Sequence, residues 1–403
     1  MWKKGFIFSI LLLFTGVAPA LGQTEPVPVN PLEVPVEDNT YIPKIDRPLT
    51  PIERRRLREY LEKQDKQAQE LYNTGKEAEA FGIWYEEIKL SRYLGAVAEV
   101  QTLGKVGEKA WNKDKTSQVK TIIERMENIQ KKAEVNQETN AELLSTLGIA
   151  YEQVRSIDNA LVIYDKLLAN AKIDGNQASQ ETYLSKIGEL HLMRFDYAKA
   201  GPIYEDLLGR AKTRSDSLKS GIYLQRLAEI YRESSQPANA VRIKEELVEN
   251  YLKNQQIQSI PELKIAIGSD YQALKDPNKA GQSFQEAYAL AWSIQQLGTA
   301  AEALDKLAEL YKSYQQIDYA LQIYQELLKV QQLGYNYYGL MNTYDKIGQI
   351  YLEKNNLPLA MDSFQKGWEL SKAIRYNEEY FQTRMAQVNQ AMNPPEPEPQ
   401  PTP

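Results

Sequence analysis

Hydrophobic residues between positions 141 and 170 recur at helical spacing and fall into two groups. The spacing is i, i+3, i+4, i+7 in the first group and i, i+4, i+7, i+8 in the second, so each group occupies one face of a helix. The members are Leu144, Leu147, Gly148 and Tyr151, followed by Ala160, Tyr164, Leu167 and Leu168. Residues typical of helix starts stand where a second helix would begin, at Asp158, Asp276, Pro277, Asp318 and Pro358. The pattern predicts pairs of amphipathic helices and an all-α fold.

This pair recurs every 40 residues without an insertion or a deletion. A small residue marks each repeat, at Gly148, Gly188, Ala228, Gly268, Ala308 and Gly348. Three positions later stand Tyr151, His191, Tyr231, Tyr271, Tyr311 and Tyr351, and twelve positions after the small residue stand Ala160, Ala200, Ala240, Ala280, Ala320 and Ala360. Sixteen positions after it stand Tyr164, Tyr204, Phe284, Tyr324 and Phe364, with Lys244 as the exception. We expect the small residues to let paired backbones approach, and the aromatic residues to fill space towards the neighbouring repeat.

The register extends towards the N-terminus in weaker form. Ala68, Leu71, Ala80 and Trp84 fit it, whereas Glu108, Lys120 and Glu124 do not and Trp111 alone keeps its position in that repeat. We therefore predict about eight helix-pair units over residues 51–375, with the unit at 108–124 degenerate. Because one pair cannot bury its apolar face alone, the units must stack.

The spacing and residue types resemble the signature of the tetratricopeptide repeat (TPR), in which Leu-x-x-Leu-Gly-x-x-Tyr precedes Ala-x-x-x-Tyr/Phe. The resemblance covers about residues 68–370, in a long 40-residue variety of the repeat. It implies a right-handed α-solenoid of antiparallel helix pairs whose first helices line a concave groove for protein segments. The groove positions that it implies are Ser145, Glu152, Ser185, Glu189, Gln225, Glu229, Arg232, Ser269, Gln272, Asp305, Glu309, Lys312, Asp345 and Gln349.

The two ends of the chain differ from the repeats. Lys3 and Lys4 precede an apolar run at 5–17 and small residues at Ala20 and Gly22, which predicts a signal peptide over 1–22 and an exported bacterial protein, with an uncleaved anchor as the alternative. A Pro-rich leader over 23–50 is expected to be disordered. Thr50, Pro51 and Glu53 predict a helix start. A capping helix is expected over 376–392, followed by a disordered Pro/Glu-rich tail over 393–403.

Charge and composition narrow the partners. The chain has a net charge of −6 with acidic and basic residues interleaved, which disfavours nucleic acid as a partner. It contains no cysteine and one histidine, His191, which takes a position held by tyrosine in other repeats. We interpret His191 as a packing residue. No phosphate loop, metal-binding pair or nucleophile motif is found, so we predict no cofactor and no metal.

Two further features are candidates for contacts with a partner. Tyr335, Tyr337 and Tyr338 lie near Gly334 and Gly339 in a connection between repeats, where they are either an aromatic binding anchor or buried loop residues. Lys186/Glu189, Arg226/Glu229 and Lys306/Glu309 recur at i, i+3 and are expected mainly to pair within their helices.

We therefore expect a non-catalytic scaffold or adaptor of the cell envelope that binds extended or helical protein segments. The expected compartment is the periplasm, the thylakoid lumen of a photosynthetic bacterium, or the secreted fraction. A role as an assembly factor, with peripheral association with a membrane complex, is a further expectation. The competing hypothesis is a hydrolase that uses a pair of carboxylates on a helical-hairpin fold.

Overall fold

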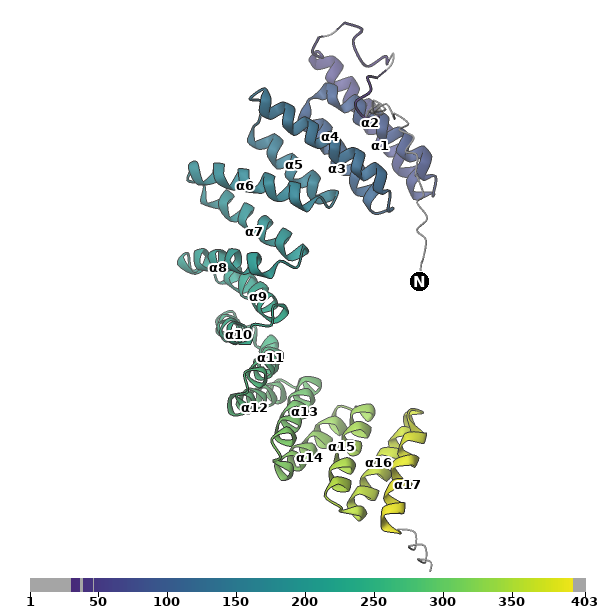
Figure 1. Cartoon of the computed structure of the whole chain (residues 1–403), viewed down its shortest axis with the longest axis vertical. Helices are drawn as coiled ribbons and strands as arrows, with labels where there is room; N and C mark the ends of the chain where they lie inside the picture. The colour runs from purple at the N-terminus through teal and green to yellow at the C-terminus, as the bar shows by residue number, and fades with distance from the viewer. Residues whose placement is uncertain (1–29, 37–38, 46, 394–403) are drawn as a thin grey trace, which may run out of the picture. The chain divides into compact units, whose positions relative to one another are not determined.

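The computed structural model describes residues 30–36, 39–45 and 47–393, and its elements are helices and connections (Figure 1). The predicted signal peptide, the leader up to residue 29 and the tail from residue 394 lie outside these residues. The helices are α1 Pro51–Asn73, α2 Glu77–Ser91, η1 Arg92–Leu94, α3 Ala96–Trp111, α4 Thr116–Val135, α5 Ala141–Gln153, α6 Ile157–Ile173, α7 Gln177–Met193, α8 Tyr197–Thr213, α9 Ser217–Glu233, α10 Pro237–Lys253, η2 Ile257–Ser259, α11 Ile260–Ala273, α12 Pro277–Ser293, α13 Leu297–Ser313, α14 Ile317–Leu333, α15 Tyr337–Glu353, α16 Leu357–Ile374 and α17 Glu378–Met392. The prediction of an all-α fold built from helix pairs is confirmed.

The chain divides into two compact units, one up to Ile163 and the other from Tyr164 onwards. In the second unit the pairs are α7–α8, α9–α10, α11–α12, α13–α14 and α15–α16, and from α7 to α17 each helix packs against the next one in the chain. None of the helices in the described part of the chain combines the length and the apolar character that a bilayer span requires.

Helix ends recur every 20 residues, and the connections that follow them share one backbone conformation. From Arg155 to Arg375, the residue that follows each helix by one or two positions takes a positive φ of 52–66°. These residues are Arg155, Gly175, Phe195, Ser215, Ser235, Gln255, Lys275, Gln295, Gln315, Tyr335, Asn355 and Arg375. The left-handed conformation reverses the chain after the helix, and glycine, the residue that adopts it without strain, is present at one of these positions.

The recurring spacing of small and aromatic residues reflects a contact inside the helix pairs. A Cβ atom on Gly188 would lie 2.9 Å from the Tyr204 ring, and one on Gly268 would lie 2.5 Å from the Phe284 ring. Gly348 and Phe364 have the same relationship, at 2.7 Å. The aromatic residue sixteen positions on therefore packs against its own pair's first helix. It also faces the neighbouring repeat, as expected. The Tyr204 ring lies 6.3 Å from that of Tyr223 on α9, and Phe284 packs in one core cluster with Leu307 on α13.

Neighbouring pairs are joined by hydrogen bonds from the tyrosine three positions after the small residue. The Tyr231 hydroxyl donates to Glu205 Oε1 and the Tyr271 hydroxyl donates to Glu245 Oε1, both at 2.8 Å and both across 26 residues. Gln285 donates to the Tyr311 hydroxyl across the same interval, at 3.4 Å. The repeated tyrosine thus packs its ring between helices and fixes the register of one pair on the next.

The unit predicted to be degenerate is a helix pair, α3–α4, whose register is displaced by one residue. Gly107 and Val119 are buried and take the places expected at 108 and 120. Ala110 is buried where Trp111 was expected to pack, and Trp111 is exposed. The mismatch at Glu108, Lys120 and Glu124 arises because a gap-free register places these three side chains one position out of phase.

The described part of the predicted leader is packed. Leu32 is fully buried, Leu49 is buried beside Leu57, and the Tyr41 ring stacks on Tyr60 with 4.2 Å between centroids. The expectation of a disordered segment up to residue 50 does not describe these packed residues, although Val34 and Ile45 in the same segment are exposed. The helix start predicted at Thr50 forms a capping box with Glu53.

The final helix, α17, packs on α16. Phe381 and Val388 are buried, and the Phe381 ring lies so close to Gly367 that a Cβ there would approach it to 2.3 Å. The helix begins at Glu378, two residues later than predicted, because Arg375 and Asn377 both take positive φ.

Lys244, the exception to the aromatic register, is compensated in the next pair. Its side chain is buried on α10 and its Nζ lies 2.7 Å from Asp270 Oδ2 on α11. Other repeats have Leu190, Ile230, Leu310 and Ile350 at the position of Asp270. The pair thus departs from the repeat at two adjoining places.

We predict that Asp270→Leu alone destabilises the second unit by about 3–5 kcal/mol, because it leaves a buried ammonium unpaired. The double substitution Lys244→Tyr with Asp270→Leu restores the repeat residues and should be neutral or stabilising. Thermal unfolding by circular dichroism, with hydrogen exchange of α10 and α11, measures both. A double variant as unstable as Asp270→Leu would contradict this account.

Candidate protein-binding surfaces

The side chains predicted to line a groove lie on the first helices of successive pairs. Ser145 and Glu152 are on α5 in the first unit, and the others are on α7, α9, α11, α13 and α15 in the second. All of them are at least partly exposed. These side chains are accessible, and their role in binding stays a prediction.

Several of these positions are engaged in a charge network. Lys346 Nζ on α15 lies 2.6 Å from Asp305 Oδ1 and 2.9 Å from Glu309 Oε1 on α13. The Tyr324 hydroxyl also donates to Glu309, at 2.8 Å. Burial favours the neutral amine of Lys346, but the two carboxylates outweigh it and raise its pKa. Burial likewise opposes ionisation of Glu309, whose pKa is nevertheless lowered by Lys346 and Tyr324. A ligand at this place must compete with these bonds.

Asp345 forms a second network with the capping helix. The Tyr380 hydroxyl lies 3.0 and 3.1 Å from the two carboxyl oxygens of Asp345, and Arg384 Nε donates to the same hydroxyl at 3.0 Å. Burial raises the pKa of Asp345, although Tyr380 and Arg384 act in the opposite direction. Tyr380, Arg384 and Lys346 were absent from the predicted set because their contacts join helices that the repeat pattern treats separately.

Two of the three predicted i, i+3 charge pairs are present. Lys186 lies 4.0 Å from Glu189, and Arg226 lies 3.3 Å from Glu229. Glu309, expected to pair with Lys306, instead contacts Lys346 of the next pair. The exposed pairs contribute little to stability and leave their charges accessible to a partner.

The tyrosines predicted as an aromatic anchor divide between two places. Tyr335 and Tyr337 line a cavity of about 490 Å³ together with Leu340, Tyr344, Lys366 and Leu370. Tyr338 instead meets Tyr376 edge to face, with 5.6 Å between ring centroids. Tyr337 and Tyr338 belong to the first turn of α15, so the expected connection comprises only residues 334–336.

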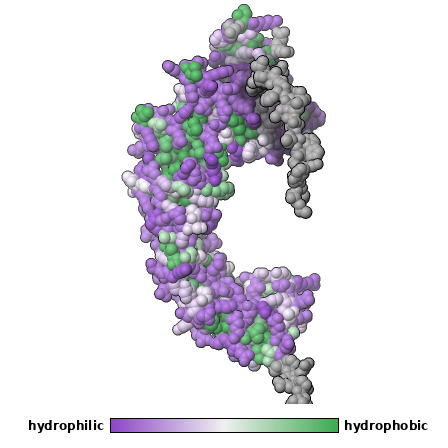
Figure 2. Space-filling view, in the orientation of Figure 1, coloured by the Kyte–Doolittle hydropathy of each residue, from purple (hydrophilic) through white to green (hydrophobic). Residues whose placement is uncertain are grey.

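Like Phe195, Tyr335 is an exposed aromatic residue with a positive φ after a helix, but Tyr335 also lines a cavity. It is 78% exposed and holds a φ of 52°, which is unfavourable for a bulky side chain. On the face shown in Figure 2, exposed apolar residues form separate patches within a mostly hydrophilic surface. An exposed aromatic ring held at a conformational cost beside an aromatic cavity is a feature that a binding role would explain.

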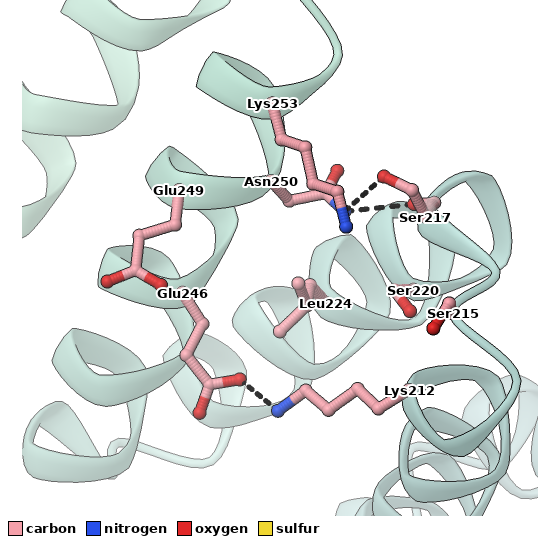
Figure 3. A pocket seen from close by; sticks show the side chains of 9 residues that line it. All are labelled: Lys212, Ser215, Ser217, Ser220, Leu224, Glu246, Glu249, Asn250 and Lys253. Carbon is pink, nitrogen blue, oxygen red and sulfur yellow. Dashed lines mark hydrogen bonds and ion pairs between the residues drawn. The ribbon is translucent and has the colours of Figure 1, made fainter.

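A more polar depression lies over α8, α9 and α10 (Figure 3). It encloses about 480 Å³, with Leu224 at its base and Lys212 paired with Glu246 across it. Asn250 Nδ2 donates to the Ser217 carbonyl at 2.9 Å, so this side chain is occupied in holding α10 against α9. Sequence reasoning missed this depression because most of its polar lining residues lie outside the repeat signature and come from three different helices.

His191 occupies a tyrosine position with incomplete hydrogen bonding. Its Nδ1 lies 3.6 Å from Asp196 Oδ2 and is buried without a hydrogen-bond partner among the described residues. Burial lowers the pKa of His191, while the carboxylates of Asp196 and Asp165 oppose the shift and Lys199 and Arg194 reinforce it. Within the described residues, no group of three or more histidine and acidic side chains is arranged to hold a metal ion.

Together these features define an all-α solenoid of tandem antiparallel helix pairs with a TPR-like fold. No protein-family model and no curated protein sequence matches the chain. Among solved structures, it is similar to BtubC from P. vanneervenii (18% identity, 61% of this chain and 96% of that one, TM-score 0.36). It is also similar to the apo form of RapI, with 12% identity over 78% of this chain and 98% of that one and a TM-score of 0.41. A third similar structure is the STAND protein PH0952 of Pyrococcus horikoshii, which has a tetratricopeptide repeat sensor. The identity is 12% over 77% of this chain and 50% of that one, with a TM-score of 0.43.

We predict that stability falls with acidification through His191. Because the pKa of His191 is lowered on folding, the unfolded chain takes up its proton first as the pH drops below about 6.5. His191→Tyr restores the repeat residue and should reduce the loss of melting temperature between pH 7 and pH 5. The chain has no other histidine, so the comparison isolates this group. Identical pH profiles for the two proteins would contradict the assignment.

Proposed function

We propose that this chain is a non-catalytic protein-binding scaffold that holds extended or helical client segments against the first helices of the second unit. The observation that carries the proposal is the repeated exposure of polar side chains at one register on α7, α9, α11, α13 and α15. Such an array offers many weak contacts, which suits an extended partner better than a small molecule.

The aromatic cavity beside α15 supplies the anchor that the polar array lacks. Tyr335 and Tyr337 offer large, exposed contact area next to Leu340 and Leu370, while Lys366 and Glu369 border it. A client side chain placed there would gain apolar burial, while the charges at the edge would restrict its orientation.

We also propose that the protein acts outside the cytoplasm, in the periplasm or thylakoid lumen or as a secreted protein. The basis is the charged and apolar pattern of residues 1–22. An assembly factor attached peripherally to a membrane complex fits a scaffold in this location. The carboxylate-hydrolase alternative draws no support from Asp345, because both of its carboxyl oxygens accept from Tyr380.

Site-specific photocrosslinking in an envelope extract tests the binding face. A crosslinker at Glu229 or Lys306, on first helices, should capture the same client peptides. The exposed positions Gln282 and Gln322, on the second helices α12 and α14, serve as matched controls and should capture them several-fold less. Equal capture from both faces, or capture from the control positions alone, would reject the proposed face.

A second test concerns the anchor. Tyr335→Ala with Tyr337→Ala should weaken capture of that client at least tenfold, equivalent to about 1.4 kcal/mol, because aromatic residues in a cavity carry much of a binding energy. Tyr314→Ala with Tyr319→Ala removes two exposed tyrosines outside the cavity and should leave capture unchanged. Affinity is measured by titration with the crosslinked client peptide. Equal losses in both double variants would show that the cavity is not an anchor.

A further inference from the structure

Residues 30–33 form a four-residue turn on the surface of the first unit. The Glu33 amide donates to the Asn30 carbonyl at 2.8 Å, and the Leu32 amide donates to Asn30 Oδ1 at 2.9 Å. Asparagine at the first position and Pro31 at the second favour such a turn from local chemistry alone. The segment therefore needs little help from the rest of the protein to adopt this shape.

The Asn30 and Glu33 side chains and the Leu32 carbonyl each bond to a specific group on the helices, whereas Pro31 is exposed. Asn30 Nδ2 donates to the Thr121 carbonyl on α4 at 2.8 Å, and the Arg92 guanidinium donates to the Leu32 carbonyl. Leu32 is fully buried. The residues that receive the turn, Arg92, Thr121, Arg125 and Asn128, form what we call the socket. The turn contacts them through single groups, as a bound peptide would, and not through the regular packing of one helix on another.

The charge of the socket fits the carboxylate that it receives. Arg125 Nη1 lies 2.6 Å from Glu33 Oε2, and Asn128 Nδ2 donates to Glu33 Oε1 at 3.2 Å. Arg125 is also held by Glu99, at 2.8 and 3.0 Å, so Glu33 is its second carboxylate. Arg92 and Lys132 add two further positive charges around these groups. Without Glu33, the socket would keep an excess of positive charge.

The socket continues beyond the turn. A cavity of about 360 Å³ adjoins Pro31 and is lined by Tyr85, Lys89, Ser117, Gln118 and Thr121. Gln118 Oε1 is buried there and has no hydrogen-bond partner among the described residues. A longer ligand could place a donor against it.

We propose that the socket between α2 and α4 is a peptide-binding site for a turn that presents an aliphatic side chain followed by a carboxylate, and that Asn30–Glu33 fills it in cis as a built-in competitor. A client with the same chemistry binds by displacing the turn. The site lies in the first unit and is independent of the first-helix face proposed for the second.

The test uses a fluorescent peptide with the sequence of residues 27–36 and three forms of the whole chain. Leu32→Ser with Glu33→Lys empties the socket in cis, and Val34→Ser is the matched control because Val34 is exposed and adjoins the turn. Fluorescence anisotropy should show binding to the emptied variant at least tenfold tighter than to the wild type or to Val34→Ser. A peptide carrying the same two substitutions as the emptied variant should not bind.

Circular dichroism establishes that the emptied variant is folded. If this folded variant fails to bind the peptide, the socket is not a peptide site. If all three forms bind equally, the turn does not occupy the site in competition. A dimer of the wild type that dissociates on Leu32→Ser with Glu33→Lys, measured by sedimentation, would place the turn in the socket of a second copy and overturn occupancy in cis.

Discussion

The contact between a small residue on one helix and an aromatic ring on its partner sets the geometry on which the repeats depend. At Gly188, Gly268 and Gly348 the ring takes the volume that a side chain would need. In these three pairs the absence of a Cβ lets the ring lie directly against the first helix, and in two other pairs Ala228 and Ala308 keep the side chain at this position small. Each pair then presents the same shape to the next, and the tyrosine hydrogen bonds across 26 residues can recur in one register. The faces available to a partner are those that contact neither the other helix of the pair nor the next pair.

The fold was largely predictable because its determinants are periodic. A 3.6-residue pattern predicted the helices, and a 40-residue pattern predicted their pairing. The direction of the aromatic rings towards the neighbouring repeat was predicted, but spacing alone did not show that each ring also fills the space beside a glycine of its own pair. The α3–α4 pair was predicted, but as a degenerate unit, for a different reason. A displacement of one residue moves Gly107 and Val119 out of a register that allows no gaps, while burial in three dimensions is insensitive to it.

The candidate sites were predictable only where they follow the repeat. Positions on the first helices were placed correctly on the surface, and Tyr335 and Tyr337 were recognised as an aromatic group. Partners such as Lys346 for Glu309, or Tyr380 for Asp345, depend on which helices adjoin in space. The turn at Asn30 was overlooked because proline enrichment indicates a spacer, whereas one leucine and one glutamate decide whether such a segment docks.

The left-handed residue that closes each helix has a consequence for how such a chain changes in length. Eleven of the twelve boundaries from Arg155 to Arg375 carry a residue other than glycine, so the stop signal is a backbone state and not a particular amino acid. Duplication or loss of a 40-residue block beginning and ending at such a boundary joins two equivalent conformations, whatever residues meet there. The array can therefore grow or shrink by whole pairs through single recombination events. Its surface residues can change while the backbone conformation between helices stays the same.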